Sequence, residues 1–243
     1  MAEYDLPEGP AGLFEAVREA FGEHLGGEQH MRLGGGTALA MRWAHRHSTD
    51  VDLFTEREAY TRLWRRRDGF KRDVEERAGT PQVFAVRRWN TRIVLQGGGE
   101  ITLFTIGPQT EEPSSADTIA GTRVPLETNA EILAKKLWGR MLDSEELLTR
   151  DLYDFAVAQR HDPDAVKAAM NHIDVSDLQQ LKRELEALPG GWMDGTGQRT
   201  LIRPAYPQEA ADPTPFVRAQ VWREILSRRP ARPHHGPPPS SDR

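Results

Sequence analysis

The sequence predicts an α+β fold, with strands and helices in the first half of the chain and an almost wholly helical second half. Three observations lead to this prediction. Short strand-like segments alternate with helical ones up to residue 106, a loop rich in proline, serine and acidic residues spans 107–122, and helical spacing dominates afterwards. We expect a core domain over 1–110, a helical domain over 123–228 and a disordered tail over 229–243, which has too few apolar groups to offset the entropy of ordering.

The first half begins with a helix followed by a strand. Apolar residues recur at three- and four-residue intervals over Gly9–Leu25, as a helix with one buried face requires. The segment HMRLGGG predicts a short strand that breaks into a glycine turn, and a helix over Thr37–His45 follows. The other elements expected here are a two-faced strand over Thr49–Phe54, a charged helix over Glu56–Ala78, and strands over 81–89, 91–96 and 100–106 with a turn at Gly97–Gly99.

The second half contains five expected helices. Thr128, with Glu131 three residues later, makes a capping box for a helix over 130–142. The other four helices are expected over 144–160, 162–173, 175–188 and 215–226.

Composition excludes several classes of protein. Hydrophobic residues make up 37% and charged residues 28% of the chain, and no stretch approaches the roughly 18 apolar residues of a membrane span, so we expect a cytoplasmic protein with no membrane partner. The acidic start lacks the features of a secretory signal, and export by that route is not expected. With no cysteine, any metal must bind oxygen or imidazole, and the net charge of -5 argues against a general nucleic-acid coat.

Two acids on one strand predict a metal site. Asp50 and Asp52 are two residues apart, so their carboxylates project from the same face of the expected strand. Adjacent anions repel each other unless a cation is present. Carboxylates are the ligands that magnesium prefers, and such a site takes its remaining oxygens from water and substrate phosphates. The pair therefore indicates Mg²⁺ together with a phosphorylated ligand.

The glycines upstream fit the same ligand. Backbone N–H groups of Gly35 and Gly36, at the start of a helix, present no side chain to block a phosphate, and the helix dipole favours an anion there. The Thr37 hydroxyl is a further possible donor. Either motif alone is weak, but the thirteen residues Thr37–Thr49 between Gly36 and Asp50 suffice for one helix and a return to an adjacent strand.

This arrangement resembles the signature of the nucleotidyltransferase superfamily. More specifically, GGTAL followed by HRHSTDVDLF is similar to the AbiEii/AbiGii family of abortive-infection toxins, related to the MenT-type toxins. The resemblance covers roughly 32–156. It implies a small mixed sheet of the polymerase-beta type flanked by helices, a helical C-terminal domain, and transfer of a nucleotide from a nucleoside triphosphate to an acceptor, which for some relatives is transfer RNA. It also implies a cognate antitoxin encoded nearby.

The resemblance extends to a second region, ILAKKLWGRMLDSEELLTRDLYDF. Lys136 matches the family lysine because Leu137 follows it, and Lys135 is the alternative. Lys136 would neutralise charge on the transferring phosphoryl group, or else be a solvated helix lysine. Asp151 and Asp154, one helical turn apart, would orient this lysine or bind the base and ribose, and Arg150 could pair with either carboxylate.

Polar residues before the aspartates match the family pattern as well. Arg46 and Ser48 lie at the two positions where the family has polar residues before the aspartates. Arg46 either binds a phosphate bidentately or pairs with a nearby carboxylate. His45 orients a backbone group or an aspartate, or is a core histidine.

One part of the family pattern is missing. Polymerase-like sites need a third carboxylate on a neighbouring strand, and the aligned position in EITLFTI holds Thr102, which cannot act as a base. Glu100, two residues earlier on the same strand face, would complete the metal site. If it points into solvent, the site has two carboxylates. A catalytically impaired nucleotide-binding module is therefore an alternative function, and a metal-dependent glycosyltransferase is a third.

Two further features have alternative interpretations. The basic stretch Arg62–Arg72 contains Trp64 and Phe70, and it is either an RNA-binding segment or a solvated helix face with buried aromatic side chains. His234 and His235 lie in the expected tail, where two solvated histidines are the simpler interpretation than a metal site.

Overall fold

A computed structural model describes residues 2–96, 99–171 and 173–228 of the chain. Gly97 and Gly98 of the expected glycine turn lie outside the described residues, as does the tail 229–243 with its two histidines.

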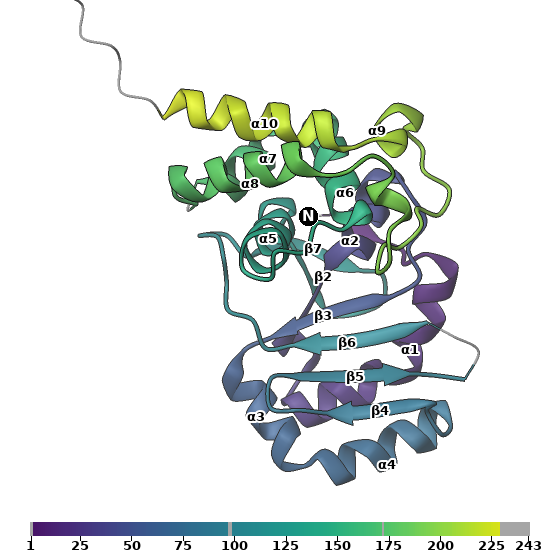
Figure 1. Ribbon diagram of the computed structural model, residues 1–243. Helices are drawn as coiled ribbons and strands as arrows, with labels where there is room; N and C mark the ends of the chain where they lie inside the picture. Colours follow the sequence, from purple (N-terminus) through teal and green to yellow (C-terminus); the bar gives the residue numbers. More distant parts are fainter. Residues whose placement is uncertain (1, 97–98, 172, 229–243) are drawn as a thin grey trace, which may run out of the picture.

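A single mixed sheet forms the centre of the molecule (Figure 1). Its eight strands lie in the order β1-β7-β8-β2-β3-β6-β5-β4. In the middle, β2 pairs antiparallel with β3, and β3 pairs parallel with β6. The strands are β1 (Glu3–Tyr4), β2 (Met31–Gly34), β3 (Val51–Thr55), β4 (Val83–Val86), β5 (Asn90–Val94), β6 (Glu100–Phe104), β7 (Ser114–Ile119) and β8 (Pro125–Glu127).

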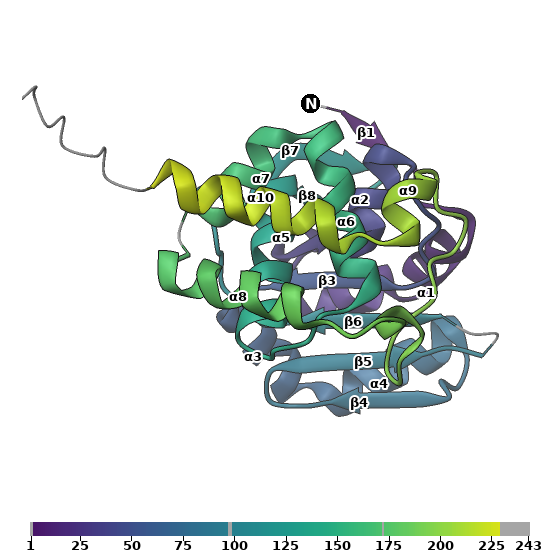
Figure 2. The same cartoon turned by 45° about the horizontal axis from the view of Figure 1, so that its top comes forward.

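Helices cover both sides of this sheet. One face of β3, β6, β5 and β4 is covered by α1 (Glu8–Leu25), α3 (Arg57–Arg65) and α4 (Arg67–Ala78), and the C-terminal helices gather on the other side (Figures 1 and 2). α1 forms because Phe14, Val17 and Phe21 repeat at helical spacing and are all buried. The remaining helices are α2 (Gly35–Trp43), α5 (Asn129–Lys135), which continues as a π-helical segment (Lys136–Leu142), α6 (Thr149–His161), α7 (Pro163–Met170), α8 (Val175–Ala187), α9 (Pro207–Ala211) and α10 (Thr214–Ser227).

The predicted fold class is confirmed, and several element boundaries are corrected. The Thr128 side chain accepts a hydrogen bond from the Glu131 N–H at 3.1 Å, as the capping box predicts. The charged helix is interrupted at Arg66, and the helix expected from residue 144 begins at Thr149. The stretch 107–122, expected to be a loop, contains β7, whose pairing with β1 and β8 overrides its weak intrinsic preference for strand.

The sheet and the C-terminal helices share one core. Buried apolar side chains form a cluster that includes Leu33, Leu53 and Leu103 of the central strands together with Phe155 of α6 and Leu181 of α8. The boundaries at residues 110 and 123 stay a prediction. Among the described residues, no helix combines the length and apolar character needed to cross a membrane.

Candidate functional site

The turn from β2 into α2 brings a helix N-terminus against a carboxylate. α2 begins at Gly35, two residues earlier than expected, so Gly35 and Gly36 belong to its first turn. Gly34 lies opposite Asp52 in the β2–β3 pairing. Gly35 has a φ of 62°, a left-handed conformation, and a Cβ there would collide with the Asp52 carboxylate. Only glycine meets both requirements, which explains why the chain places it at this position.

A buried hydroxyl pair ties α2 to the segment before β3. The Thr37 Oγ1 lies 2.7 Å from the Ser48 Oγ, and it also donates to the backbone carbonyl of Asp50. Thr37 is buried, so its hydroxyl holds the Asp50 backbone in place instead of reaching open solvent.

A polar cavity of about 240 Å³ opens in front of these elements. It joins residues from the sheet with residues of the C-terminal half. Of the eleven residues predicted for the site, Gly35, Thr37 and Asp154 are not in its lining, and each contacts or adjoins a lining residue. The predicted residues that line it are Gly36, Arg46, Ser48, Asp50, Asp52, Glu100, Lys136 and Asp151, and the others include Thr102, Arg140, Arg150 and Arg199.

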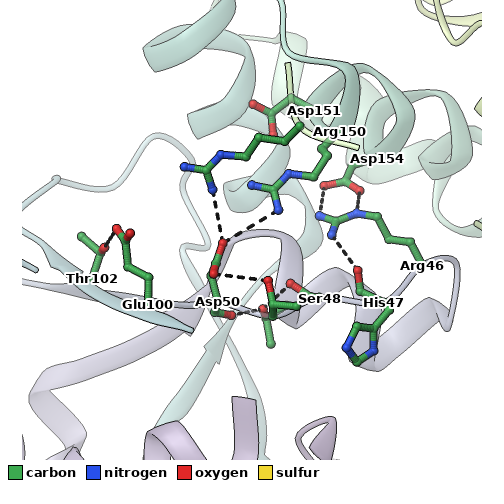
Figure 3. Close-up of polar contacts among 12 residues, drawn as sticks. Arg46, His47, Ser48, Asp50, Glu100, Thr102, Arg150, Asp151 and Asp154 are labelled. Carbon is green, nitrogen blue, oxygen red and sulfur yellow. Dashed lines mark hydrogen bonds and ion pairs between the residues drawn. The ribbon is translucent and has the colours of Figure 1, made fainter. Parts of the chain in front are cut away.

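Arginines surround the Asp50 carboxylate (Figure 3). Its Oδ2 lies 3.3 Å from the Arg199 Nη1 and 3.8 Å from the Arg150 Nη1, while Oδ1 accepts a hydrogen bond from Thr49 at 3.3 Å. Arg150 therefore pairs with Asp50, not with Asp151 or Asp154. These cations leave the cavity open and give it a rim suited to phosphate.

Asp52 faces the same cavity without a protein partner. Within the part of the chain that the structure describes, its half-buried carboxylate makes no hydrogen bond or ion pair. Burial raises the pKa of Asp52, and the positive charges of Arg140 and Lys136 partly oppose this effect. Asp52, with free lone pairs, and Asp50, which immediately precedes β3, line the same cavity, and two such carboxylates are oxygen donors that fit a divalent cation.

The neighbouring strand places Thr102 where the alignment predicts it. In the parallel β3–β6 pairing Thr102 lies opposite Asp52. The Glu100 carboxylate lines the same cavity, but it accepts a hydrogen bond from the Thr102 Oγ1 at 3.0 Å (Figure 3). It also accepts one from the Arg92 Nη2 at 2.8 Å. The hydrogen bond from Arg92 holds the pKa of Glu100 below its usual value. Across the described residues, no three histidine or acidic side chains are grouped closely enough to hold a metal.

Lys136 is held at the cavity wall by two carboxylates. Its Nζ contacts Asp151 and lies 3.1 Å from the Asp154 Oδ2. Arg140, four residues further on, donates to the other Asp151 oxygen at 2.8 Å. Sequence reasoning identified this lysine and both acids but missed Arg140, whose i+4 spacing from Lys136 was the available signal.

Asp154 pairs with Arg46 behind the cavity (Figure 3). Arg46 binds it bidentately at 2.6 and 2.9 Å, and the His45 Nε2 lies 2.8 Å from the same carboxylate. The structure thus favours the ion-pair alternative for Arg46 and the aspartate-orienting one for His45. Burial alone would raise the pKa of Asp154. The positive charges of Arg46 and Lys136 outweigh this effect and hold the pKa well below its usual value, so the carboxylate stays ionised.

A loop from the C-terminal half completes the site. Arg199 lies between α8 and α9, in a segment that pairs with the residues before β3 through a backbone bridge from His47 to Ile202. The sequence carries no local signal for this contact, because Arg199 and Asp50 are brought together only by the fold.

The match to a family model decides the protein's family. Residues 20–228 match the model described as the nucleotidyl transferase AbiEii toxin of type IV toxin–antitoxin systems, which is most of the chain and includes both halves of the site. The chain belongs to the AbiEii family. This AbiEii protein is accordingly a nucleotidyltransferase, and the glycosyltransferase hypothesis is set aside.

One solved structure agrees with the fold. The AbiEii chain is similar to the crystal structure of a candidate nucleotidyltransferase from H. pylori, with a TM-score of 0.53 and 15% identity over 91% of this chain and 97% of that one. A solution structure of the antibiotic-resistance factor ANT(2'')-Ia aligns at a TM-score of 0.35 and 14% identity, over 72% of this chain and 90% of that one. No curated protein matches the sequence. The H. pylori likeness, at that identity, supports the fold of the AbiEii protein.

Proposed function

We propose that this AbiEii protein is a magnesium-dependent toxin that transfers a nucleotide from a nucleoside triphosphate to an RNA acceptor, with transfer RNA the first candidate. The observation that carries the proposal is the convergence on one cavity of two carboxylates, a glycine-lined helix N-terminus and Lys136. In the reaction, an acceptor hydroxyl oxygen attacks the α-phosphorus, the bond to the β-phosphate oxygen breaks, pyrophosphate leaves and the hydroxyl proton is released.

Asp50 and Asp52 are the residues proposed to hold the divalent ion. When bound, Mg²⁺ would supply Lewis-acid polarisation of the phosphates and neutralise developing negative charge. Glu100 is proposed to turn toward the ion as a third oxygen donor when the metal binds, since in the structure it is not grouped with Asp50 and Asp52. The two bonds it accepts from Arg92 and Thr102 leave lone pairs on both of its oxygens. The expected result for Glu100→Gln is a higher Mg²⁺ concentration at half-maximal activity.

The chain's own groups provide the remaining functions. The N–H groups of Gly35 and Gly36 and the hydroxyl of Ser48 are proposed to bind phosphate oxygens, with Arg150 and Arg199 neutralising the triphosphate. Lys136 stabilises the charge that develops as pyrophosphate leaves, and Asp151 and Asp154 orient it. Thr37 and Arg46 support the site by fixing the Asp50 backbone and the Asp154 carboxylate.

The decisive experiment is a labelling reaction. The wild-type protein, Mg²⁺, total RNA and each α-labelled nucleoside triphosphate in turn should yield a labelled RNA species. An Asp50→Ala, Asp52→Ala double variant should label nothing, and Asp164→Asn, an exposed acid on α7, should label normally. Equal labelling by the double variant would refute the proposal.

The cellular setting is part of the proposal. AbiEii toxins belong to type IV toxin–antitoxin systems, and this membership supports the proposal of a cytoplasmic enzyme with an antitoxin encoded nearby. Expression in a bacterial host should inhibit growth, Asp50→Ala should remove the inhibition, and an adjacent gene for the antitoxin should suppress it. Unchanged growth inhibition by Asp50→Ala would separate toxicity from this site.

Thr102 favours a second candidate function, a nucleotide-binding module with impaired catalysis. A threonine lies opposite Asp52 where a third carboxylate is needed. This candidate predicts nucleoside triphosphate binding by calorimetry with no turnover, so measured turnover would remove it.

A further inference from the structure

A groove lined by tryptophan and arginine lies outside the site described above. Trp64 on α3 is 42% exposed, and Trp89, in the turn between β4 and β5, is 47% exposed. Both line a groove of about 500 Å³. The basic residues of its lining are Arg57, Arg87 and Arg88, the other lining residues are Tyr60, Thr61, Val86 and Thr105, and no acidic residue is among them.

Arginine side chains stack on both tryptophan rings. The Arg88 guanidinium lies 4.9 Å and that of Arg57 5.1 Å from the Trp89 ring centroid, and Arg67 lies 5.5 Å from that of Trp64. Exposed aromatic rings cost free energy in water, and these contacts hold them in fixed orientations next to positive charge. Flat rings supply stacking surfaces for nucleobases, and the guanidinium groups supply contacts for phosphates.

The sequence pointed to a different aromatic pair. Phe70, the partner of Trp64 in the basic stretch, is fully buried and packs 4.9 Å from the ring of Phe21. The second exposed ring beside Trp64 is Trp89 instead of Phe70, because the sheet brings the β4–β5 turn next to α3 (Figure 1). The surface therefore exists only in the folded protein.

The groove lies at the end of the sheet where β3 and β6 finish. β3 and β6 both run from the carboxylate positions toward this end, where α3 and the β4–β5 turn are found (Figure 1). Along the chain just after β6, Thr105 lines the groove, and its neighbour Phe104 lines the active-site cavity. The groove lies on the α3 side of the sheet and the cavity on the side of the C-terminal helices, so an RNA segment held in the groove would pass around the end of β6 to reach the cavity.

From these observations we propose that this groove binds an unpaired, single-stranded segment of the RNA acceptor, with bases on Trp64 and Trp89 and phosphates on Arg57, Arg87 and Arg88. The choice of RNA rests on the proposed function. A protein partner would need a broader apolar centre than this lining provides, since Val86 is its single aliphatic residue. A lining that combines exposed rings with positive charge alone is complementary to unpaired nucleic acid.

The test measures RNA binding without nucleotide. A fluorescein-labelled single-stranded RNA of about 20 nucleotides is titrated with the protein, and Trp64→Ala, Trp89→Ala should weaken binding at least about tenfold. Trp64→Phe, Trp89→Phe should restore binding to within about threefold, since the ring is retained. Arg57→Ala, Arg88→Ala should lower the slope of log Kd against log salt by about one to two.

The matched control is Trp222→Ala. Trp222 on α10 is 39% exposed and has the Lys182 Nζ 5.2 Å from its ring, so it is a similar aromatic and cationic pair on another element. Its replacement should leave Kd unchanged, and circular dichroism should show that all variants are folded. Unchanged binding by the double alanine variant, or an equal loss with Trp222→Ala, would overturn the proposal. The absence of RNA binding by the wild type would also overturn it.

Failure of this proposal is distinguishable from failure of the proposed function. If RNA binds through the two tryptophans but no nucleotide is transferred, the groove stands and the transferase proposal fails. If transfer occurs and the double alanine variant keeps the wild-type KM for RNA, the groove proposal fails alone. If both the transferase proposal and the groove proposal are right, the double alanine variant should have a higher KM for RNA and an unchanged KM for the triphosphate.

Discussion

Asp154 is the residue on which the buried side of the site depends. Its carboxylate contacts Arg46, His45 and Lys136, and no part of this aspartate is exposed. Buried charges are tolerated when each has a partner of opposite sign, and removing one partner leaves the others uncompensated. The proposed role of Lys136 and the stability of the fold are therefore linked at this one side chain.

Replacing Asp154 by asparagine should destabilise the protein by roughly 2–4 kcal/mol, because Arg46 and Lys136 lose a buried counter-charge. Urea denaturation followed by circular dichroism measures the change. Asp164→Asn, at an exposed position on α7, should change the free energy of unfolding by less than about 1 kcal/mol. A stability loss for Asp154→Asn no larger than that of the control would contradict this account of the network.

Glu127 is a buried acid with an unusual protonation equilibrium. Burial raises its pKa to about 7, although Lys135 opposes the shift. Arg32 Nε lies 3.6 Å from one Glu127 oxygen, and the other oxygen has no hydrogen-bond partner among the described residues. The folded protein thus keeps a proton on Glu127 at pH values where the unfolded chain has lost it.

This protonation makes stability depend on pH in a defined direction. Between about pH 4.5 and pH 7 the folded state binds more protons at Glu127 than the unfolded state, so the contribution of this residue to stability falls as pH rises and is constant above pH 7. Glu127→Gln should remove this component. The free energy of unfolding of the variant relative to the wild type should increase from pH 5 to pH 7.5, by at most about 3 kcal/mol. A difference independent of pH would show that Glu127 titrates normally.

At the scale of elements, the β2–α2–β3 unit and the segment after α5 build the site. Gly35 lets Asp52 approach the N-terminus of α2. The π-helical segment Lys136–Leu142 begins at the site lysine and carries Arg140, and both side chains contact Asp151. Departures from α-helical geometry are frequent at functional sites, since they reorient side chains that regular packing would direct elsewhere.

Gly35→Ala tests the first of these elements. Because the φ of Gly35 is 62° and a Cβ would meet the Asp52 carboxylate, alanine should cost at least about 2 kcal/mol of stability and lower nucleotide transfer at least about tenfold. The control is Gly12→Ala on the exposed side of α1, where no atom lies within 4 Å of the added Cβ. It should be neutral or stabilise the protein by up to about 1 kcal/mol. Equal effects of the two substitutions on thermal unfolding would refute this argument.

At the scale of the whole molecule, the two halves of the chain share both the sheet and the site. β7 and β8 lie between β1 and β2 in the strand order, although they come after residue 110. Lys136, Asp151 and Arg199 then face Asp50 and Asp52 across one cavity. The site is therefore a property of the complete fold.

A fragment of residues 1–110 should not fold cooperatively. It lacks β7 and β8, so β1 has no partner, one edge of β2 is unpaired, and the apolar faces that pack on α6 and α8 become exposed. Urea titration of the fragment should show no sigmoidal transition, unlike the full chain under the same conditions. A cooperative transition with an m-value proportional to its length would instead support the division into two domains at residues 110 and 123.

The sequence by itself determined the local arrangement and the family. Spacing predicted a strand over the two aspartates, of which the structure keeps Asp52 in β3 and leaves Asp50 just before it, and it placed glycines at a helix start. The motifs identified the nucleotidyltransferase family and pointed to Lys136, because strand and helix periodicity and short motifs are local properties of the chain. Only the tertiary structure decided that Arg199 reaches Asp50, that Asp154 takes Arg46 as its partner, and that Trp89 joins Trp64. The physical reason is that these contacts join residues distant in the chain, and their geometry depends on strand order and core packing, which no local pattern encodes.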